Sequence, residues 1–241
     1  MYVLLVANVI FYLAAGFDQF LVLLLATAVS YVVACKMGKL HEKLEKQKQE
    51  EGLDRKQIKR MKANNKKQRK RILIWGLVLN IGILVVFKYT NFLLKTGYSI
   101  LDLFGIGHGD DLFKLIMPLG ISFYTFQTMG YVIDVYRGKA EAEKNIFKMA
   151  LFTSFFPQLI QGPISRFGEL SQTLYAPHRF DFRTVWFGLE RVLWGYFKKL
   201  VIADRIVVAV NAIVGQPDIY SGFYVFCGML FYAAELYADF T

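Results

Sequence analysis

The sequence is poor in the residues that build metal centres and disulfide frameworks. It contains two cysteines, Cys35 and Cys227, and three histidines in 241 residues. Both cysteines lie in or at the edge of apolar runs, and they form neither a CxxC pattern nor a disulfide framework. We therefore interpret both as small buried side chains, and we predict no metal site and no bound cofactor.

Charge is scarce over long stretches of the chain. Hydrophobic residues make up 55% of the sequence and the mean hydropathy is +0.36, which exceeds the average for a soluble domain. A helix needs about 20 apolar residues to cross about 30 Å of hydrocarbon, so several runs are short for a full crossing. The sequence predicts an all-α, polytopic integral membrane bundle of about six to eight membrane helices, some short or re-entrant. The nearly uncharged runs are 2–17, 19–35, 72–87, 115–133, 149–165, 206–217 and 219–234.

The basic residues are concentrated in one segment. Residues 36–71 hold 15 Lys plus Arg and 5 Asp plus Glu, an excess equal to the net charge of the whole chain, +10. Such an excess between two apolar runs predicts a cytoplasmic loop near anionic lipid headgroups rather than a nucleic-acid-binding surface. Most of it is expected to be a solvated helix with pairs such as Glu42 with Lys46. We predict three regions: N-terminal membrane helices over 1–35, the basic cytoplasmic loop over 36–71 and a membrane core over 72–241.

Residues 88–114 interrupt the apolar pattern. The segment carries Lys95, Asp102, His108, Asp110 and Asp111 together with a glycine-rich stretch. This composition predicts an interfacial amphipathic segment followed by a loop rather than a crossing.

Three of the five prolines lie inside or at the mouth of apolar runs. Each proline removes a backbone donor and frees a carbonyl one turn back, which lipid cannot satisfy. Broken backbone at membrane depth is tolerated where it is buried in protein or lines a polar cavity. The residues concerned, Pro118, Pro157 and Pro163 with Gln158, Gln161 and Gly162, therefore predict the wall of an internal passage, although a simple kink is the alternative for Pro118.

Polar side chains recur along residues 120–133. Tyr124, Gln127 and Tyr131 follow a spacing of three and then four, which places them on one helix face directed away from lipid. An unpaired amide in hydrocarbon costs roughly 2 to 7 kcal/mol, so Gln127 requires partners. Contacts between helices are the alternative to a role in substrate binding.

Charged residues also appear near membrane depth in the second half of the chain. Glu235 and Asp239 are candidates for function, with local ion pairs or interfacial placement as the alternative. Lys198 and Lys199 are interpreted as side chains that reach the headgroup layer.

Several blocks in order carry a resemblance to a known family. They are MPLGISFYTFQ from Met117, DVYRG from Asp134, FFPQLIQGPISRF from Phe155, GLERVLWGYFKKLVIADRI from Gly188 and the final ELYADFT. Together they resemble the membrane-bound O-acyltransferases, in the bacterial branch that contains alginate O-acetyltransferases and the D-alanyl transfer proteins of teichoic acid modification.

The resemblance implies a multi-pass enzyme of the bacterial plasma membrane that transfers an acyl group, here acetyl, to hydroxyls of an extracytoplasmic polysaccharide or cell-wall polymer. The implied donor is acetyl-CoA or an acyl-carrier thioester reaching the site from the cytosol. Implied partners are the lipid bilayer, the donor, the polymer acceptor and partner acyltransferase proteins. Within this reading we assign substrate contacts to Tyr124, Gln127, Gln158, Gln161, Arg166, Glu235 and Asp239.

The sequence departs from the family in its histidines. The family's catalytic histidine belongs to a Trp-His element downstream of the YADFT-like block, beyond Thr241, so the catalytic residue is not assigned within this chain. His41, His108 and His178 do not lie in apolar spans. The chain is therefore expected to be a fragment truncated at both ends and, by itself, inactive.

Two other classes of function stay open at this point. A transporter or channel would use similar broken helices, and a non-catalytic scaffold of a polysaccharide-modification complex would also suit a partial bundle. The coding sequence downstream of Thr241 discriminates between them, because a Trp-His pair there supports the enzyme.

Overall fold

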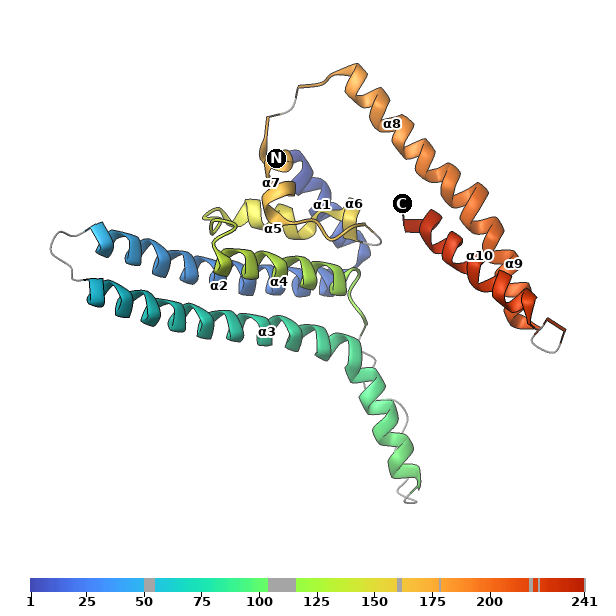
Figure 1. The fold of residues 1–241 in the computed structure, drawn as a ribbon, viewed down its shortest axis with the longest axis horizontal. Helices are drawn as coiled ribbons and strands as arrows, with labels where there is room; N and C mark the ends of the chain where they lie inside the picture. The colour runs from blue at the N-terminus through green and yellow to red at the C-terminus, as the bar shows by residue number, and fades with distance from the viewer. Residues whose placement is uncertain are drawn as a thin grey trace. The chain divides into compact units, whose positions relative to one another are not determined.

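The computed structural model describes residues 1–49, 55–103, 116–159, 162–177, 179–216, 219–220 and 222–240. Over these residues every regular element is a helix, which confirms the predicted all-α class (Figure 1). The chain divides into two compact units, 1–177 and 178–241. Each unit is described by itself.

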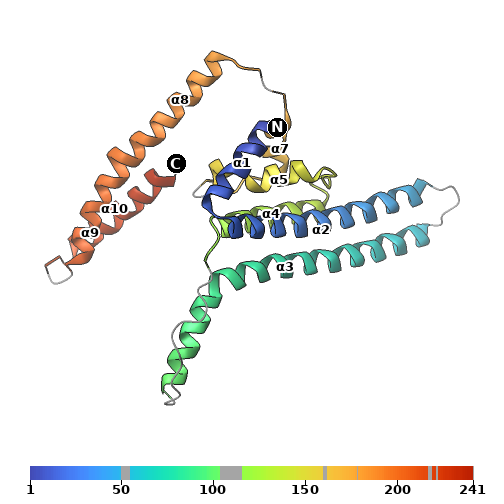
Figure 2. The same cartoon turned by 180° about the vertical axis from the view of Figure 1, so that it is seen from behind.

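Three helices at the N-terminus carry most of the membrane signal. Helix α1 (Tyr2–Ala15) leads through Gly16 into α2 (Phe17–Gln49), and α3 (Arg55–Leu103) runs back along α2 (Figures 1 and 2). Helices α2 and α3 are both long and apolar enough to cross a membrane, and α1 is apolar but shorter. Only 11% of the most apolar window of α3 is buried within the protein, so lipid is the natural cover for its outer face. The number of crossings beyond these helices stays a prediction.

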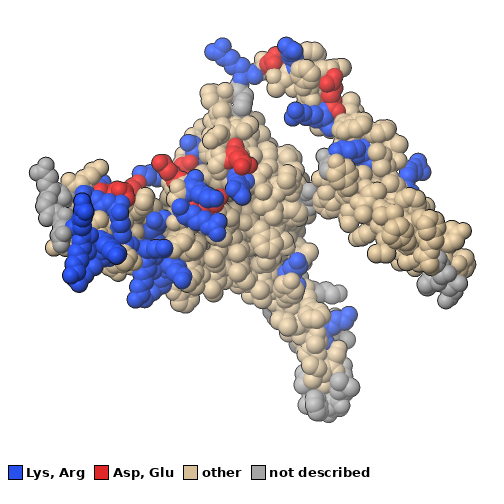
Figure 3. Space-filling model, in the orientation of Figure 1, with Lys and Arg blue, Asp and Glu red and all other residues tan. Residues whose placement is uncertain are grey.

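The basic segment is formed by the ends of α2 and α3. Lysines and arginines gather over residues 36–49 of α2 and 55–71 of α3, which we call the basic arms (Figure 3). The predicted helical conformation is therefore confirmed over the described part of 36–71. The carboxylate of Glu42 lies 2.8 Å from Nζ of Lys144 in a distant loop, and the predicted partner Lys46 contributes a weaker electrostatic interaction.

Helix α3 extends beyond the apolar run 72–87. Residues 88–103 continue this helix, and their position at the membrane interface stays a prediction. Nothing in this stretch breaks the helix, since Lys95 is compatible with helical structure. Residues 104–115, with His108, Asp110 and Asp111, lie outside the described residues.

The prolines coincide with breaks between short helices. Helix α4 (Ile121–Arg137) follows Pro118, and α5 (Ile146–Ser154), α6 (Phe156–Leu159) and α7 (Phe167–Tyr175) follow in turn. Pro157 lies in the first turn of α6, where its missing N–H is tolerated, and Pro163 lies in the non-helical segment before α7. The apolar run 149–165 is therefore broken twice along its length.

Two hydrophobic clusters hold the first unit together. One joins α2, α4, α5 and α7, and its aromatic centre pairs Phe167 with Tyr131 at 4.4 Å and with Phe152 at 5.0 Å between ring centroids. The other joins α1, α2, α3, α4 and α6 around Tyr12, Leu23 and Tyr124. Together they fix the position of α4 against its neighbours.

The second unit consists of α8 (Phe182–Phe197), a π-helical turn η1 (Lys198–Ala203), α9 (Asp204–Gly215) and α10 (Phe223–Phe240). Lys199 lies 3.1 Å from Asp204 and 2.7 Å from Asp239. Two carboxylates of its own unit therefore hold the Lys199 ammonium group, and the placement of Lys198 and Lys199 at the headgroup layer stays a prediction.

Candidate functional site

A polar hollow lies beside α4, and we call it the α4 pocket. It has a volume of about 290 Å³ and is formed by one face of α4, the turn after it and the non-helical segment before α7. Its lining residues are Gln127, Gly130, Tyr131, Ile133, Asp134, Arg137, Lys139, Ile164, Ser165 and Arg166. The pocket therefore contains two of the predicted substrate contacts, Gln127 and Arg166.

Gln127 occupies the deep end of this pocket. Its side chain is only 7% exposed, and Nε2 donates a 3.3 Å hydrogen bond to the carbonyl oxygen of Phe152 on α5. The predicted inward stripe is confirmed, because Tyr124 and Tyr131 are also buried. An inward amide at this depth is paired with protein rather than exposed to lipid, as its desolvation cost requires.

The broken backbone after α6 supplies the opposite wall. Gly162 donates its N–H to the carbonyl of Gln158 at 3.0 Å, and Gln158 Nε2 donates to Ser165 Oγ at 2.8 Å. These two bonds fold the segment back on itself and place Ser165 and Arg166 at the pocket. Gln158 therefore contributes by holding the wall rather than by lining the pocket. Gln161 lies outside the described residues.

Positive charge dominates the shallow end of the pocket. Arg137, Lys139 and Arg166 line it together with a single carboxylate, Asp134. Arg137 lies ten residues beyond Gln127 on α4, which corresponds to about 15 Å along the helix axis. The pocket thus runs from a cationic mouth toward a buried amide, an arrangement suited to an elongated anion with a neutral end.

The mouth lies on the side of the basic arms. Arg69, in the basic arm of α3, donates from Nη2 to the carbonyl oxygens of Val135 at 2.9 Å and Tyr136 at 2.8 Å. These bonds satisfy carbonyls at the C-terminal end of α4 and fix that end beside the basic segment. If the basic arms face the cytosol, the pocket opens toward the cytosol as well.

Tyr124 belongs to a different environment. It is fully buried in the cluster around Tyr12, and within the described part of the chain the hydroxyl of neither tyrosine has a hydrogen-bond partner. The structure therefore places Tyr124 away from the lining of the α4 pocket, although it shares a helix with Gln127.

The remaining predicted contacts belong to the second unit, 178–241. Glu235 and Asp239 lie on α10 in the second unit, and Asp239 is held by Lys199. His41 Nδ1 lies 3.5 Å from Nη1 of Arg69 on the basic arms, and His108 and His178 are outside the described residues. Among the described residues no group of His, Cys, Asp and Glu could hold a metal ion.

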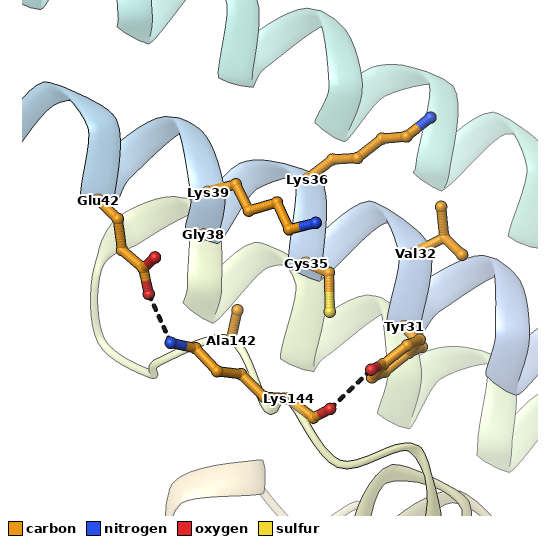
Figure 4. Close-up of a pocket in the computed structure, with 9 residues that line it drawn as sticks. All are labelled: Tyr31, Val32, Cys35, Lys36, Gly38, Lys39, Glu42, Ala142 and Lys144. Carbon is orange, nitrogen blue, oxygen red and sulfur yellow. Dashed lines mark hydrogen bonds and ion pairs between the residues drawn. The ribbon is translucent and has the colours of Figure 1, made fainter.

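A second hollow of about 530 Å³ lies between α2 and the loop after α4 (Figure 4). Tyr31 donates its hydroxyl to the carbonyl of Lys144 at 2.7 Å, and Nζ of Lys144 meets Glu42. The hydrogen bond that Nζ of Lys144 donates to Glu42, together with the charge of Glu42, raises the pKa of Lys144. Sequence reasoning missed this hollow, because Tyr31 and Lys144 are 113 positions apart.

Sequence reasoning also missed Arg137, Lys139 and Ser165 in the α4 pocket. The signal was present for Arg137, which lies in the DVYRG block that contributes to the resemblance. Ser165 carries no signal of its own, because only the fold of the broken segment brings it beside α4.

Comparison with known proteins identifies relatives of one kind. The chain is 37% identical over 172 residues to the probable alginate O-acetylase AlgI of Pseudomonas aeruginosa. The aligned stretch covers 71% of this chain and 32% of that protein. It is 36% identical to the probable alginate O-acetylase AlgI of Azotobacter vinelandii, over 71% of this chain and 34% of that protein. It is 30% identical over 195 residues to the peptidoglycan O-acetyltransferase of Helicobacter pylori, covering 70% of this chain and 36% of that protein.

These relatives confirm the predicted resemblance. The chain spans about a third of the length of the curated relatives it matches. No family model matches the chain, and no solved structure matches it.

Proposed function

We propose that this protein, a homologue of the bacterial O-acetylases, forms part of the membrane core of an enzyme that transfers acetyl groups to hydroxyls of an extracytoplasmic polymer. The observation that carries the proposal is the α4 pocket, because a cationic mouth and a buried amide are joined there in one hollow. Its relatives favour an enzyme over a transporter, channel or scaffold, since their names specify O-acetylation of alginate and of peptidoglycan.

The pocket has the chemistry to hold a phosphopantetheine thioester. Acetyl-CoA and an acyl-carrier thioester share this arm, which carries phosphate at one end and the acyl group at the other. Arginine binds phosphate through paired N–H donors, and Arg137 and Arg166 both line the mouth. Gln127, at the deep end, offers an amide donor to a carbonyl oxygen. The donor would thus enter on the side of the basic arms with its acyl group directed into the membrane.

Acyl transfer also needs a base for the acceptor hydroxyl and donors for the oxyanion. The thioester carbon forms an ester bond with the hydroxyl oxygen, the carbon–sulfur bond breaks, and the hydroxyl proton passes through the base to the leaving thiolate. The resemblance assigns the base to the histidine of a Trp-His element, a pair that these 241 residues do not contain. The residues of this chain would bind and orient the donor rather than transfer the proton.

The proposed setting is the bacterial plasma membrane, crossed several times. The relatives imply an acyl donor and a polysaccharide or cell-wall acceptor, and partner acyltransferase proteins are part of the proposal. The excess of Lys and Arg on the arms of α2 and α3 supports a cytosolic position for the pocket mouth.

Kinetics of the full-length protein test the proposal. We expect Arg137→Gln and Arg166→Gln each to raise the KM for acetyl-CoA roughly 10-fold to 100-fold with a smaller change in kcat, because a charged hydrogen bond is worth about 1.5 to 3 kcal/mol. Lys66→Gln is the matched control, because it removes one exposed charge from the basic arm without touching the pocket. Unchanged KM in both arginine variants, or an equal rise in the control, would contradict the proposal.

A further inference from the structure

A groove runs along the contact between α2 and α3, and we call it the α2–α3 groove. Its volume is about 510 Å³, and its lining is apolar apart from two basic residues, Lys36 and Arg71. Ala28 and Leu79 line the part furthest along each helix from these charges. The groove is separate from the α4 pocket, and none of its lining residues is shared with that pocket.

Close packing of the two helices creates the floor of the groove. At Gly76 a Cβ atom would lie 2.7 Å from Val33 Cγ1, so only glycine allows the helices to approach this closely. Ser30 Oγ donates to Asn80 Oδ1 at 3.2 Å one turn further on, which ties the pair together. The small side chain of Ala28 and the absent one of Gly76 leave an elongated hollow above this contact.

Both charged residues mark the same boundary. Lys36 is the first charged residue after the apolar part of α2, and Arg71 is the last one before the apolar part of α3. Trp75 lies one turn deeper than Arg71 and is 63% exposed, as tryptophans at the membrane interface are. The groove therefore begins at headgroup level and continues about 12 Å into the hydrocarbon along the eight residues from Arg71 to Leu79.

The charges of the groove are not matched by acidic residues. Among the described residues that line it there is no Asp or Glu. The nearest carboxylate on the basic arm of α2, Glu42, is held by Lys144 across the neighbouring hollow (Figure 4). The side chain of Lys36 extends from α2 toward α3 (Figure 4). Two cations above an apolar slot of this length are complementary to an anionic lipid, with phosphate at the charges and an acyl chain in the slot.

We propose that the α2–α3 groove is a binding site for one anionic glycerophospholipid of the leaflet that faces the basic arms. Its phosphate lies between Lys36 and Arg71, and one acyl chain lies along Gly76 and Ala28. The lipid fills the hollow and neutralises the two charges closest to the hydrocarbon. This inference goes beyond the proposed acetyl transfer and does not depend on it.

Native mass spectrometry of the full-length protein tests the site, with phosphatidylglycerol as the probe and phosphatidylcholine as the neutral comparison. We expect one phosphatidylglycerol to stay bound after mild detergent exchange and phosphatidylcholine to be lost. Each basic residue near an anionic surface contributes about fivefold to binding, so Lys36→Gln with Arg71→Gln should weaken retention by roughly 25-fold.

Two further variants separate the groove from general attraction to anionic lipid. Lys56→Gln with Arg60→Gln removes the same charge from exposed positions further along the arm of α3 and should retain the lipid. Ala28→Leu leaves the charge unchanged but fills the slot, and it should reduce retention. Thermal unfolding confirms that each variant is folded. Absence of bound phosphatidylglycerol in the unmodified protein, an equal loss in both double variants, or full retention by Ala28→Leu would overturn the inference.

Discussion

At the scale of single residues, Gly120 shows how the chain positions α4. Its φ of 70° lies in the left-handed region, directly before the first residue of α4. A Cβ atom at this position would contact the Leu159 side chain and lie 2.9 Å from the Leu159 carbonyl oxygen. Both the backbone conformation and the close approach therefore require glycine. This turn aligns the helix that carries Gln127 against the broken segment that supplies Arg166.

We predict that Gly120→Ala destabilises the full-length protein by more than about 1 kcal/mol, through backbone strain and the contact with Leu159. Gly130→Ala, in the same region of the chain, is the matched comparison. A Cβ there would have no neighbour within 4 Å, so alanine should be neutral or stabilise the helix by about 0.5 to 1 kcal/mol. Thermal unfolding in detergent measures both. Equal melting temperatures for the two variants would contradict this account of the turn.

Residue burial could be predicted from sequence, but residue partners could not. The spacing of Tyr124, Gln127 and Tyr131 is enough to place them on one buried face. The same spacing cannot tell that Tyr124 enters the cluster around Tyr12 while Gln127 reaches the α4 pocket. That difference depends on where α1 and the segment 162–166 pack, and these elements are distant in sequence.

At the scale of elements, helix ends are set by short polar signals. Asp181 caps the start of helix α8. Its carboxylate accepts from the N–H groups of Arg183 at 3.3 Å and Thr184 at 3.1 Å and from the Thr184 hydroxyl at 2.6 Å. The hydrogen bonds with Thr184, followed by that with the Arg183 N–H, lower the pKa of Asp181 from its ordinary value of 3.8. The carboxylate form is therefore the better cap.

We predict a pH-dependent start of α8. Folding lowers the pKa of Asp181 below its ordinary value of 3.8. The stabilisation that the carboxylate gives to the start of α8 is therefore complete when the pH is above 3.8, and it is lost as the pH falls through the lower pKa of the folded state. The protection factors of the Arg183 and Thr184 amides in hydrogen exchange, which correct for the intrinsic pH dependence of exchange, should fall over this range. Asp181→Asn keeps a capping oxygen that does not titrate, so its protection should not follow this pH dependence. The same pH profile in both proteins would rule out Asp181 as the titrating group.

The element boundaries show which patterns were informative. The prolines correctly indicate breaks in the run 149–165, because a missing N–H and a fixed φ act locally. The charges of 88–103 gave no sign that this stretch continues the helix of the preceding apolar run, as α3 does. Isolated lysines do not end a helix, since lysine has a high helix propensity and a long side chain.

At the scale of the whole molecule, the structure gives the first unit a charged side and an apolar side. The basic arms of α2 and α3 lie beyond Lys36 and Arg71, and the cationic mouth of the α4 pocket lies beside them through the bonds of Arg69. The long apolar helices and the gathering of basic residues on their arms could be predicted from hydropathy and charge, which are properties of segments. The pocket itself could not be predicted as a cavity, because it is formed by α4 and a segment about thirty residues later.

Chemical labelling from the two sides of the membrane tests the central proposal, that the α4 pocket admits the acyl donor from the side of the basic arms. In the full-length protein with Cys35 and Cys227 replaced by serine, we compare Gly130→Cys with Val78→Cys. Each position lies seven residues inside a basic boundary residue, Arg137 or Arg71, but Gly130 lines the pocket and Val78 is an exposed residue of the apolar part of α3. We predict that a membrane-impermeant thiol reagent labels Gly130→Cys only from the cytosolic side and that acetyl-CoA slows this labelling. Val78→Cys should be unreactive from either side. Unreactive Gly130→Cys, or equal labelling of the two positions, would contradict the account.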